Sequence, residues 1–361
     1  MKKTGMLAFC LAALLALPAC SKDSPESTPT PEPLPTNTPV VAPTAEPEGP
    51  SGVNPLTGMP MDEAWEGKRP VAIMLNNLKQ ALPQQGNADA DIIYECLAEG
   101  GITRMLGLYQ DLDGLGTIGS IRSSRPYYLE LALGHDAIYV HAGGSQDAYA
   151  DISAWNVTAL DGVRGPYMSN GVGDNLMWRD PDRKKAMSSE HTVVTTGEAL
   201  RTYIPDSVRR DHEEGYLYAQ QFADDGTPAG GTAAETIQVP FSSYKTGGFR
   251  YDPDTGLYMV EEYGDAYIDG NTGEQVGVTN VIVVKTACKE TGDSLAHITV
   301  DLTSGGEGYY ACGGKIIPIR WSKADRNSPL EYTTFDGQPL VLGRGKTYVN
   351  VVPLNAGVTY Q

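Results

Sequence analysis

The chain has 361 residues, of which 40% are hydrophobic and 20% charged, and its formal net charge at pH 7 is −18. This hydrophobic fraction is enough for a folded core, which excludes a chain that is disordered throughout. A surface this acidic repels polyphosphate backbones, so we expect no nucleic-acid partner. Five cysteines in a chain of this length exclude a disulfide-dense scaffold.

The N-terminus has the pattern of a bacterial export signal. Two lysines precede an uncharged, mostly apolar run at 4–19, which is too short to span a bilayer comfortably. The run leads into Leu-Pro-Ala-Cys at 17–20, which resembles a lipobox. We therefore expect a signal peptide over 1–19, cleavage before Cys20, and attachment of acyl chains such as palmitate to that cysteine. The alternative is a plain secretory peptide in which the cysteine is incidental.

The segment 20–52 has the composition of a tether. It contains nine Pro, many Ser, Thr and Glu, and no aromatic residue. Such a segment cannot bury enough apolar surface to offset the entropy of ordering, so we expect it to be disordered. Proline favours an extended chain of about 3.1 Å per residue, which would hold the folded part up to roughly 100 Å from the membrane. Anchor and tether together predict a location at the cell membrane, lipid-anchored on the extracytoplasmic face.

The segment 53–236 alternates between strand-like and helix-like patterns. The spacing of its apolar residues predicts a helix over 88–99, followed by a Gly-Gly stop. The other expected elements are strands at 70–77, 102–110 and 136–141, and helices that begin at Pro126, Gln146 and Thr196. Strands that alternate with helices favour an α/β fold with a mostly parallel βαβ N-terminal part.

From residue 237 onward the pattern changes to β. The turn sequences DPDTG (252–256) and DGNTG (269–273) are hairpin signals. Strand-like runs occupy 278–288, 296–302, 308–322 and 347–354. We therefore expect a smaller β-rich domain over 237–361.

Three cysteines lie in the folded part. Cys96 lies in an apolar stretch and is expected to be a small buried hydrophobic residue. Cys288 and Cys312 lie in strand-like segments and can either pair or remain free, which their spacing does not decide. No CxxC, HExxH or histidine-rich spacing occurs, so we expect no metal site and no cofactor.

Polar residues follow two of the predicted strands. In a parallel sheet, ligands bind at the carboxyl ends of strands, where Asn76, Asn77 and His141 would lie, with Ser145 after a Gly-Gly turn. An imidazole, backbone amides and a hydroxyl presented together suit acyl or phosphoryl chemistry with His141 as the base. The alternative is that Ser145 caps a helix and His141 is a hydrogen-bonded core residue.

Three arginines, Arg104, Arg122 and Arg125, stand out in this acidic chain. Arg125 directly precedes a predicted helix, and a helix N-terminus with guanidinium groups can bind phosphate or carboxylate. The alternative is structural ion pairing with carboxylates on neighbouring elements: Glu95, Glu99 or Glu130.

Many phrases resemble the YerB-like lipoproteins, a bacterial family described by a domain of unknown function. They are NPLTGMP (54–60), RPVAIMLNN (69–77), ADIIYECLAEGGITRMLGLYQ (90–110), IGSIRSSRPYYLELALGHDAIYVHAGGS (118–145), TNVIVV (279–284), GEGYYACGGKIIPIRWSK (306–323) and GKTYVNVVP (345–353). The resemblance implies an α/β part followed by a smaller β-rich part, in a membrane-anchored envelope protein of Gram-positive type. It implies no established reaction. Where the family has an HNLYTS-like phrase, this chain has HTVVTTGE, so His191 matches and the following asparagine does not.

These observations favour a binding or scaffold module for cell-wall glycan or an envelope protein, held at the membrane by its lipid anchor. The first alternative is an envelope enzyme that acts on a polyprenyl-phosphate-linked or peptidoglycan substrate through an Arg-lined site, by loose analogy with phosphotransferases of anionic polymers. The second alternative, a solute-binding lipoprotein, fits less well because such proteins have two α/β lobes.

Overall fold

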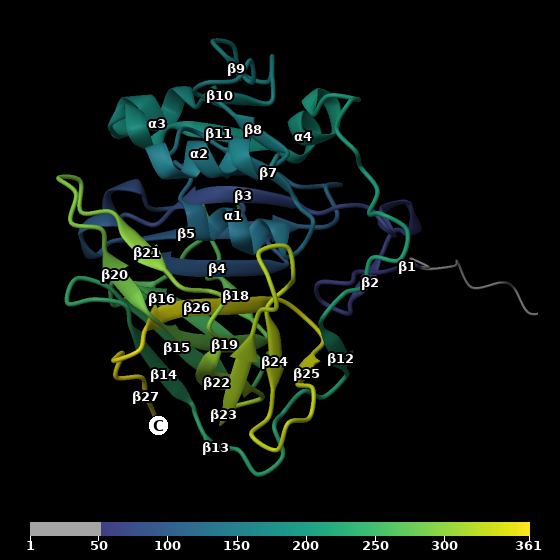
Figure 1. The fold of residues 1–361 in the computed structure, drawn as a ribbon, viewed down its shortest axis with the longest axis vertical. Helices are drawn as coiled ribbons and strands as arrows, with labels where there is room; N and C mark the ends of the chain where they lie inside the picture. The colour runs from purple at the N-terminus through teal and green to yellow at the C-terminus, as the bar shows by residue number, and fades with distance from the viewer. Residues whose placement is uncertain (1–51) are drawn as a thin grey trace, which may run out of the picture. The chain divides into compact units, whose positions relative to one another are not determined.

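The computed structural model describes residues 52–361, which belong to one compact unit. The predicted signal peptide, Cys20 and all but the last residue of the predicted tether lie outside the described residues. Most of the regular structure in the described part is β-strand, arranged in several sheets (Figure 1). No helix among these residues is long and apolar enough to cross a membrane.

The largest sheet has eleven strands. Ten of them follow one another in the order β13 (Thr232–Ala233), β23 (Lys315–Ser322), β22 (Gly306–Cys312), β19 (Asn280–Thr286), β26 (Thr347–Pro353), β4 (Ile92–Leu97), β5 (Thr103–Tyr109), β3 (Val71–Asn76), β7 (Ile138–His141) and β8 (Ala159–Asp161); β24 (Glu331–Thr333) pairs with β23. The C-terminal β26 lies between β19 and β4, parallel to both. The two predicted domains therefore contribute strands to one sheet, while the boundary between them stays a prediction.

Two smaller sheets and three strand pairs complete the β structure. The six-stranded sheet contains β17 (Asp265–Ala266), β16 (Leu257–Glu262), β15 (Thr246–Asp252), β14 (Thr236–Pro240), β27 (Thr359–Tyr360) and β18 (Gly277–Val278). The four-stranded sheet contains β6 (Thr117–Gly119), β11 (Val193–Thr196), β10 (Met177–Arg179) and β9 (Met168–Ser169). The pairs are β1 (Gly52–Val53) with β2 (Pro60–Met61), β12 (Gln221–Ala223) with β25 (Val341–Gly343), and β20 (Cys288–Glu290) with β21 (Ile298–Val300).

The helices are short. They are α1 (Pro126–Leu133), α2 (Gln146–Ala154), α3 (Pro181–Ala186) and α4 (Gly197–Tyr203), with 3₁₀ turns η1 (Glu63–Trp65), η2 (Lys79–Ala81), η3 (Glu99–Gly101) and η4 (Ser189–His191). Helix α1 begins with proline, whose fixed φ suits the first helical position. Helix α4 is capped by the Thr196 hydroxyl, which accepts a hydrogen bond from the Ala199 amide.

The expected mostly parallel βαβ arrangement is wrong, because the fold is mostly β. Strand β5 runs antiparallel to both of its neighbours, β4 and β3. Parallel strand pairs in the N-terminal part are β3 with β7, β7 with β8, a short β9–β10 contact, and the contacts of β4 with the C-terminal β26 and of β12 with the C-terminal β25. A tight turn at η3 joins β4 to β5, whereas a parallel connection needs a crossover of a dozen or more residues.

The helix expected over 88–99 is in fact the strand β4. All six residues of β4 are buried, so its apolar residues do not alternate with polar ones. A short apolar run that is buried on both faces cannot be distinguished from a helix by periodicity. The β-branched and aromatic sequence Ile92-Ile93-Tyr94 favours a strand, and pairing with β26 and β5 decides the outcome.

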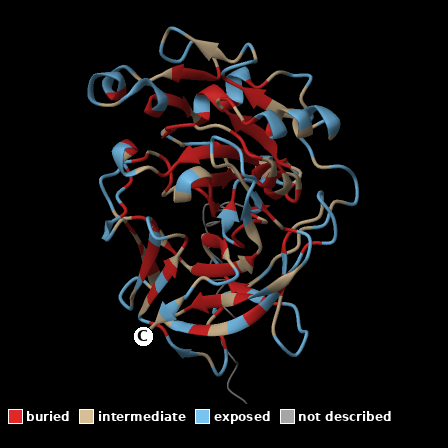
Figure 2. Cartoon of the chain, turned by 60° about the vertical axis from the view of Figure 1, so that its left-hand side comes forward, coloured by how far each residue is buried: buried red, intermediate tan, exposed pale blue. Residues whose placement is uncertain are grey.

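The central strands β3, β4, β5 and β7 of the large sheet are buried on both faces, whereas β23 near its edge alternates between buried and exposed residues; Figure 2 shows both kinds of strand. Ile73 and Leu75 of β3 belong to one hydrophobic cluster and Met74 to the other, as the alternation of side chains along a strand requires. The first cluster includes Phe249 of the six-stranded sheet, and the second includes Tyr128 of α1. Because these layers cover the central strands, ligand-accessible surface beside β3, β5 and β7 lies at the ends of these strands.

Candidate functional site

The carboxyl ends of β3 and β7 lie on the same side of the large sheet, because these two neighbouring strands are parallel. The first residues of the antiparallel β5 reach the same side, so Arg104 lies opposite Asn76. Several predicted site residues come together there, and we call them the carboxyl-end cluster. They are Asn76, Arg104, Arg122, Arg125 and His191.

Asn76 and His191 are in direct contact within this cluster. The Asn76 Nδ2 atom lies 2.8 Å from His191 Nδ1, and the Asn76 Oδ1 atom accepts a hydrogen bond from the Leu78 amide at 3.0 Å. His191 is almost fully buried. Burial, followed by the nearby Arg122, lowers the pKa of His191 below its usual value, so the neutral imidazole is favoured.

The Glu99 carboxylate holds Arg104 and Arg125, whereas a backbone carbonyl holds Arg122. Arg125 donates two hydrogen bonds to Glu99 Oε2, at 2.8 and 3.1 Å, and Arg104 contacts the other oxygen of the same carboxylate. Arg122 donates to the Glu190 carbonyl at 2.8 Å and lies 3.7 Å from the carboxylate of that residue. Three guanidinium groups and two carboxylates leave a single net positive charge. The structure thus contains the ion pairing with Glu99 that the sequence offered as the alternative.

Ser145 and His141 make separate contacts. The Ser145 hydroxyl accepts a hydrogen bond from the Ala148 amide at 3.2 Å and so caps α2. The fully buried His141 has its Nδ1 atom 2.7 Å from the Gly143 carbonyl oxygen and 3.9 Å from Asp161. Burial lowers the pKa of His141. Between residues 52 and 361 no hydrogen bond joins the two side chains, so an acid–base pair is not assembled.

Asn77 faces a buried charged cluster. The Lys245 ammonium lies 3.0 Å from Glu95 Oε1 and also contacts Glu262, and all three side chains are at most 1% exposed. Asn77 donates to Glu95 at 2.8 Å, and the Tyr348 hydroxyl donates to Glu95 at 2.7 Å. Burial, followed by the nearby Glu95 charge, raises the pKa of Glu262 to about 7. These contacts tie β4 and β26 of the large sheet to β16 of the six-stranded sheet.

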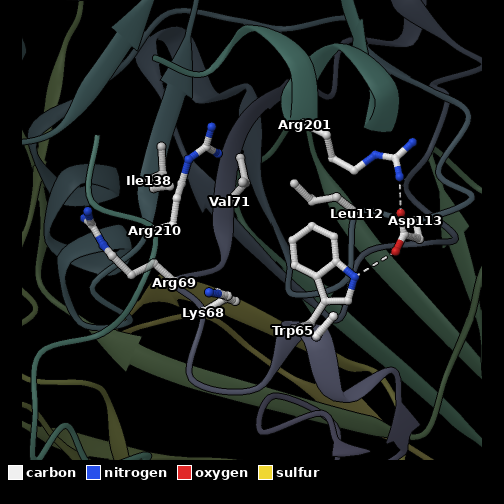
Figure 3. Close-up of a pocket in the computed structure, with 10 residues that line it drawn as sticks. Trp65, Lys68, Arg69, Val71, Leu112, Asp113, Ile138, Arg201 and Arg210 are labelled. Atoms are coloured by element: carbon white, nitrogen blue, oxygen red, sulfur yellow. Dashed lines mark hydrogen bonds and ion pairs between the residues drawn. The ribbon is translucent and has the colours of Figure 1, made fainter. Parts of the chain in front are cut away.

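A pocket of about 420 Å³ lies at the opposite, amino end of β3 and β7 (Figure 3). We call it the amino-end pocket; it is lined by Ala64, Trp65, Lys68, Arg69, Val71, Leu112, Asp113, Ile138, Arg201 and Arg210. Val71 and Ile138 are the first residues of their strands and, with Leu112, supply buried apolar surface. Four of the ten lining residues are cationic and one is acidic, in contrast to the acidic chain as a whole.

The indole of Trp65 is oriented by a carboxylate. Its Nε1 atom donates to Asp113 Oδ2 at 3.0 Å, and Arg201 of α4 pairs with the other oxygen of the same carboxylate (Figure 3). One carboxylate thereby positions both an aromatic ring and a cation at one side of the pocket. The ring remains partly exposed.

Arg210 differs from the other cations of the pocket. Lys68 pairs with Asp211 at 2.5 Å, and Arg69 lies 3.2 Å from Asp136. Arg210 donates to the Ile204 carbonyl at 2.7 Å and has no ion pair among residues 52–361. Burial lowers the pKa of Arg210 from its usual value. The nearby Asp206 charge partly offsets this effect but forms no ion pair with Arg210. A half-buried guanidinium whose carboxylate neighbour stays beyond ion-pair distance is suited to an anionic ligand.

This pocket was not predicted from the sequence. Its cations come from two segments that are more than a hundred residues apart, 68–69 and 201–210. The available signals were the basic pairs Lys68-Arg69 and Arg209-Arg210, which are unusual in a chain with net charge −18. Neither pair forms a motif, and although Lys68 and Arg69 closely follow Trp65 in the sequence, only the fold brings Arg210 to the same pocket.

The cysteines and metal-binding residue types add no further site in the described part. Cys96, Cys288 and Cys312 are free, so the disulfide that spacing left open is not formed. Among residues 52–361, no group of three or more His, Cys, Asp or Glu side chains is arranged to hold a metal ion.

Comparison with known protein families shows the family to which the chain belongs. Residues 56–210 match the N-terminal domain of DUF3048, a family of proteins of unknown function. Residues 237–349 match the C-terminal domain of the same family. The chain belongs to this YerB-like family. The resemblance drawn from the sequence phrases is thereby confirmed.

Two comparisons describe family relatives. YerB of Bacillus subtilis (strain 168), which is named as a lipoprotein, is 29% identical to this chain over 309 residues, covering 83% of the chain and 86% of YerB. The crystal structure of YerB from Bacillus subtilis matches with a TM-score of 0.72 and 26% identity, covering 85% of this chain and 99% of that one. The family description states no activity, and the name of the relative gives a location rather than a reaction.

Proposed function

We propose that this chain is an envelope lipoprotein, anchored through Cys20 on the extracytoplasmic face of the membrane, that binds cell-wall glycan without modifying it. The N-terminal export pattern and the lipoprotein name of the Bacillus relative support the anchor. The proline-rich segment that follows is suited to holding the folded part out toward the wall.

The amino-end pocket carries the proposal. Its volume of about 420 Å³ lies in the range of small-molecule sites, which combine apolar walls with a few polar groups. Trp65 offers a large apolar ring face whose polar edge is already bonded to Asp113. The apolar face of a sugar ring can pack on this indole and on Val71, Leu112 and Ile138.

The unpaired guanidinium of Arg210 favours, among possible glycan ligands, those that carry an anionic group. A guanidinium that is half-buried and lacks an ion pair gains most from a carboxylate or phosphate, which it can bind in a bidentate manner. Peptidoglycan carries carboxylates, and wall polymers carry phosphates. Arg201 and Lys68 would add to the positive field at the mouth of the pocket.

The test is binding of the soluble part, residues 53–361, to purified peptidoglycan sacculi with and without wall anionic polymers. Arg210→Ala should lower the affinity at least about tenfold, because a hydrogen bond to a charged group contributes about 1.5–3 kcal/mol. Arg250→Ala is the matched control, because Arg250 is an exposed arginine paired with Glu261 on the six-stranded sheet. It should leave binding unchanged.

A second variant tests whether the loss of binding in Arg210→Ala comes only from the change in net charge. Trp65→Leu keeps every cation but removes the ring, and it should also weaken binding, with little change in stability. Full binding by both Arg210→Ala and Trp65→Leu would exclude the amino-end pocket as the site. Absence of binding by the unmodified protein would reject the glycan and direct the search to a protein partner by crosslinking in intact cells.

A further inference from the structure

The tautomer of His191 is set by its neighbour Asn76. The Asn76 carbonyl oxygen accepts from the Leu78 amide at 3.0 Å, so the amide NH₂ group must be the one that faces His191 Nδ1 at 2.8 Å. Since the asparagine donates, Nδ1 accepts and carries no proton. The proton of the neutral imidazole therefore lies on Nε2, which becomes a hydrogen-bond donor of fixed direction.

Glu190 lies loosely against this donor. Its Oε1 atom is 3.5 Å from His191 Nε2, and its Oε2 atom is 3.7 Å from the Arg122 guanidinium. Charge-assisted hydrogen bonds are usually about 2.7–2.9 Å long, so neither contact is a full bond. The Glu190 side chain is 59% exposed. The backbone carbonyl of the same residue holds Arg122 at 2.8 Å, so the guanidinium stays in place without the carboxylate.

A pocket of about 470 Å³ opens beside this group. Leu78, Ala186 and Met187 supply its apolar lining, and Gln80 and Ser188 supply polar atoms. His191 and Glu190 complete the lining. A ligand in this pocket would thus meet an apolar surface and the N–H donor of His191, and displacing the Glu190 side chain would bring it to Arg122, which does not itself line the pocket.

We propose that Arg122 and His191 form a carboxylate-binding site, separate from the amino-end pocket, in which Glu190 is an internal stand-in for the ligand. An incoming carboxylate displaces the Glu190 side chain and accepts hydrogen bonds from His191 Nε2 and from Arg122. The class of ligand is a short acyl or peptidyl carboxylate, whose apolar part packs against Leu78 and Met187. The site binds and does not require any covalent step.

Two variants are expected to change the affinity for a carboxylate ligand in opposite directions. Glu190→Gln removes the competing charge but keeps the size of the side chain and the backbone carbonyl, so affinity should rise about three- to tenfold. Arg122→Ala removes the main cation, so affinity should fall at least tenfold. Glu198→Gln, an exposed glutamate in the first turn of α4, is the matched control and should change nothing.

The probe is an N-acetylated dipeptide with a free C-terminal carboxylate, titrated calorimetrically into the soluble part, residues 53–361. Its C-terminal amide serves as the uncharged counterpart and should not bind. Inorganic phosphate in a parallel titration separates recognition of a carboxylate from recognition of any anion, and equal binding of phosphate would overturn the assignment to carboxylates. Equal binding of the amide, or no gain in Glu190→Gln, would overturn the site itself.

A spectroscopic measurement keeps the test independent of whether Arg122→Ala folds. The chain has five histidines, so imidazole nitrogen shifts in ¹⁵N NMR spectra can be assigned individually. His191 should show its proton on Nε2 in the free protein, and the Nε2 resonance should move on addition of the dipeptide. A proton on Nδ1, or an unmoved Nε2 resonance at saturating dipeptide, would contradict the proposal. His191→Gln, which retains a donor near the Nε2 position, should bind better than His191→Asn.

Discussion

The two ends of β3 and β7 use the same kind of residue in different ways. At the carboxyl end, Arg104 and Arg125 share the Glu99 carboxylate and are almost fully buried. At the amino end, Arg210 has no ion pair among the described residues and lines a pocket together with Trp65 and apolar side chains. A cluster of arginines in an acidic chain is therefore not in itself a ligand site. The partners of each guanidinium and the shape around it decide whether it stabilises the fold or binds.

The same contrast holds between neighbouring residues. Asn76 contacts His191, which lines a pocket, whereas Asn77 faces the sealed cluster of Glu95, Lys245 and Glu262. Successive residues at the end of a strand point to opposite faces, so one can border a pocket while the next is buried. The comparison therefore predicts large stability effects for the sealed charges and small ones for the open site.

The largest expected effect comes from the sealed cluster. Lys245→Met leaves two buried carboxylates without their cation and should lower the free energy of unfolding by roughly 3–5 kcal/mol. Denaturant unfolding of the soluble part measures the change. Lys79→Met is the control, because the Lys79–Asp265 pair is exposed and should contribute less than about 1 kcal/mol. Similar values for both lysines would show that the cluster is not structural.

The next effect concerns the shared carboxylate of the carboxyl-end cluster. Glu99→Gln leaves Arg104 and Arg125 buried without a counter-charge; because the Glu99 side chain is 23% exposed, we expect a loss of about 2 kcal/mol rather than the full cost of a sealed pair. Unfolding experiments should show this loss while binding at the amino-end pocket stays normal. Glu261→Gln, in the more exposed pair with Arg250, should change stability by less than about 1 kcal/mol. If binding to sacculi fell in parallel with stability in Glu99→Gln, the separation of the two ends would be wrong.

The smallest effect is the dependence of stability on pH that His191 contributes at the carboxyl end. The folded state lowers the pKa of His191, so below the ordinary histidine pKa of about 6.5 the unfolded chain binds the proton more readily. The contribution of His191 to stability is therefore complete above about pH 6.5 and is lost as the pH falls. Protonation of Nδ1 also opposes the hydrogen bond from Asn76.

The measurement is the difference in unfolding free energy between the unmodified protein and His191→Gln from pH 7.5 to 5. This difference should shrink as the pH falls. The amino-end pocket has no histidine in its lining, so binding there should be constant over the same range. The distinction between the two ends would be wrong if the stability difference stayed constant with pH, or if binding at the amino-end pocket changed with pH.

Local patterns predicted many elements correctly. The strands expected at 70–77, 102–110 and 136–141 correspond to β3, β5 and β7, and the helices expected from Pro126 and Gln146 correspond to α1 and α2. These elements have clear start and stop residues, such as the proline at the first turn of α1. The helix over 88–99 was wrong because burial on both faces erased the alternation that marks a strand.

The sites were harder to predict, because their residues lie far apart in the sequence. The sequence singled out Arg122 and His191, and the fold brings both beside Glu190. It missed the amino-end pocket, because Trp65 and Arg210 approach each other only through the ends of β3 and β7. Neither residue belongs to a motif, so no local pattern could have joined them.

The sequence by itself determined the family, the export pattern and the position of most strands, because these depend on residue types and spacings within short segments. Only the tertiary structure decided the direction in which the strands pair, since β26 inserts between β19 and β4 from the far end of the chain. It also decided which charges are neutralised. Strand pairs such as Tyr348 with Ile93, and ion pairs such as Lys245 with Glu95, join residues far apart in the chain. Such contacts form only when the strands of the large sheet assemble and bury their central part.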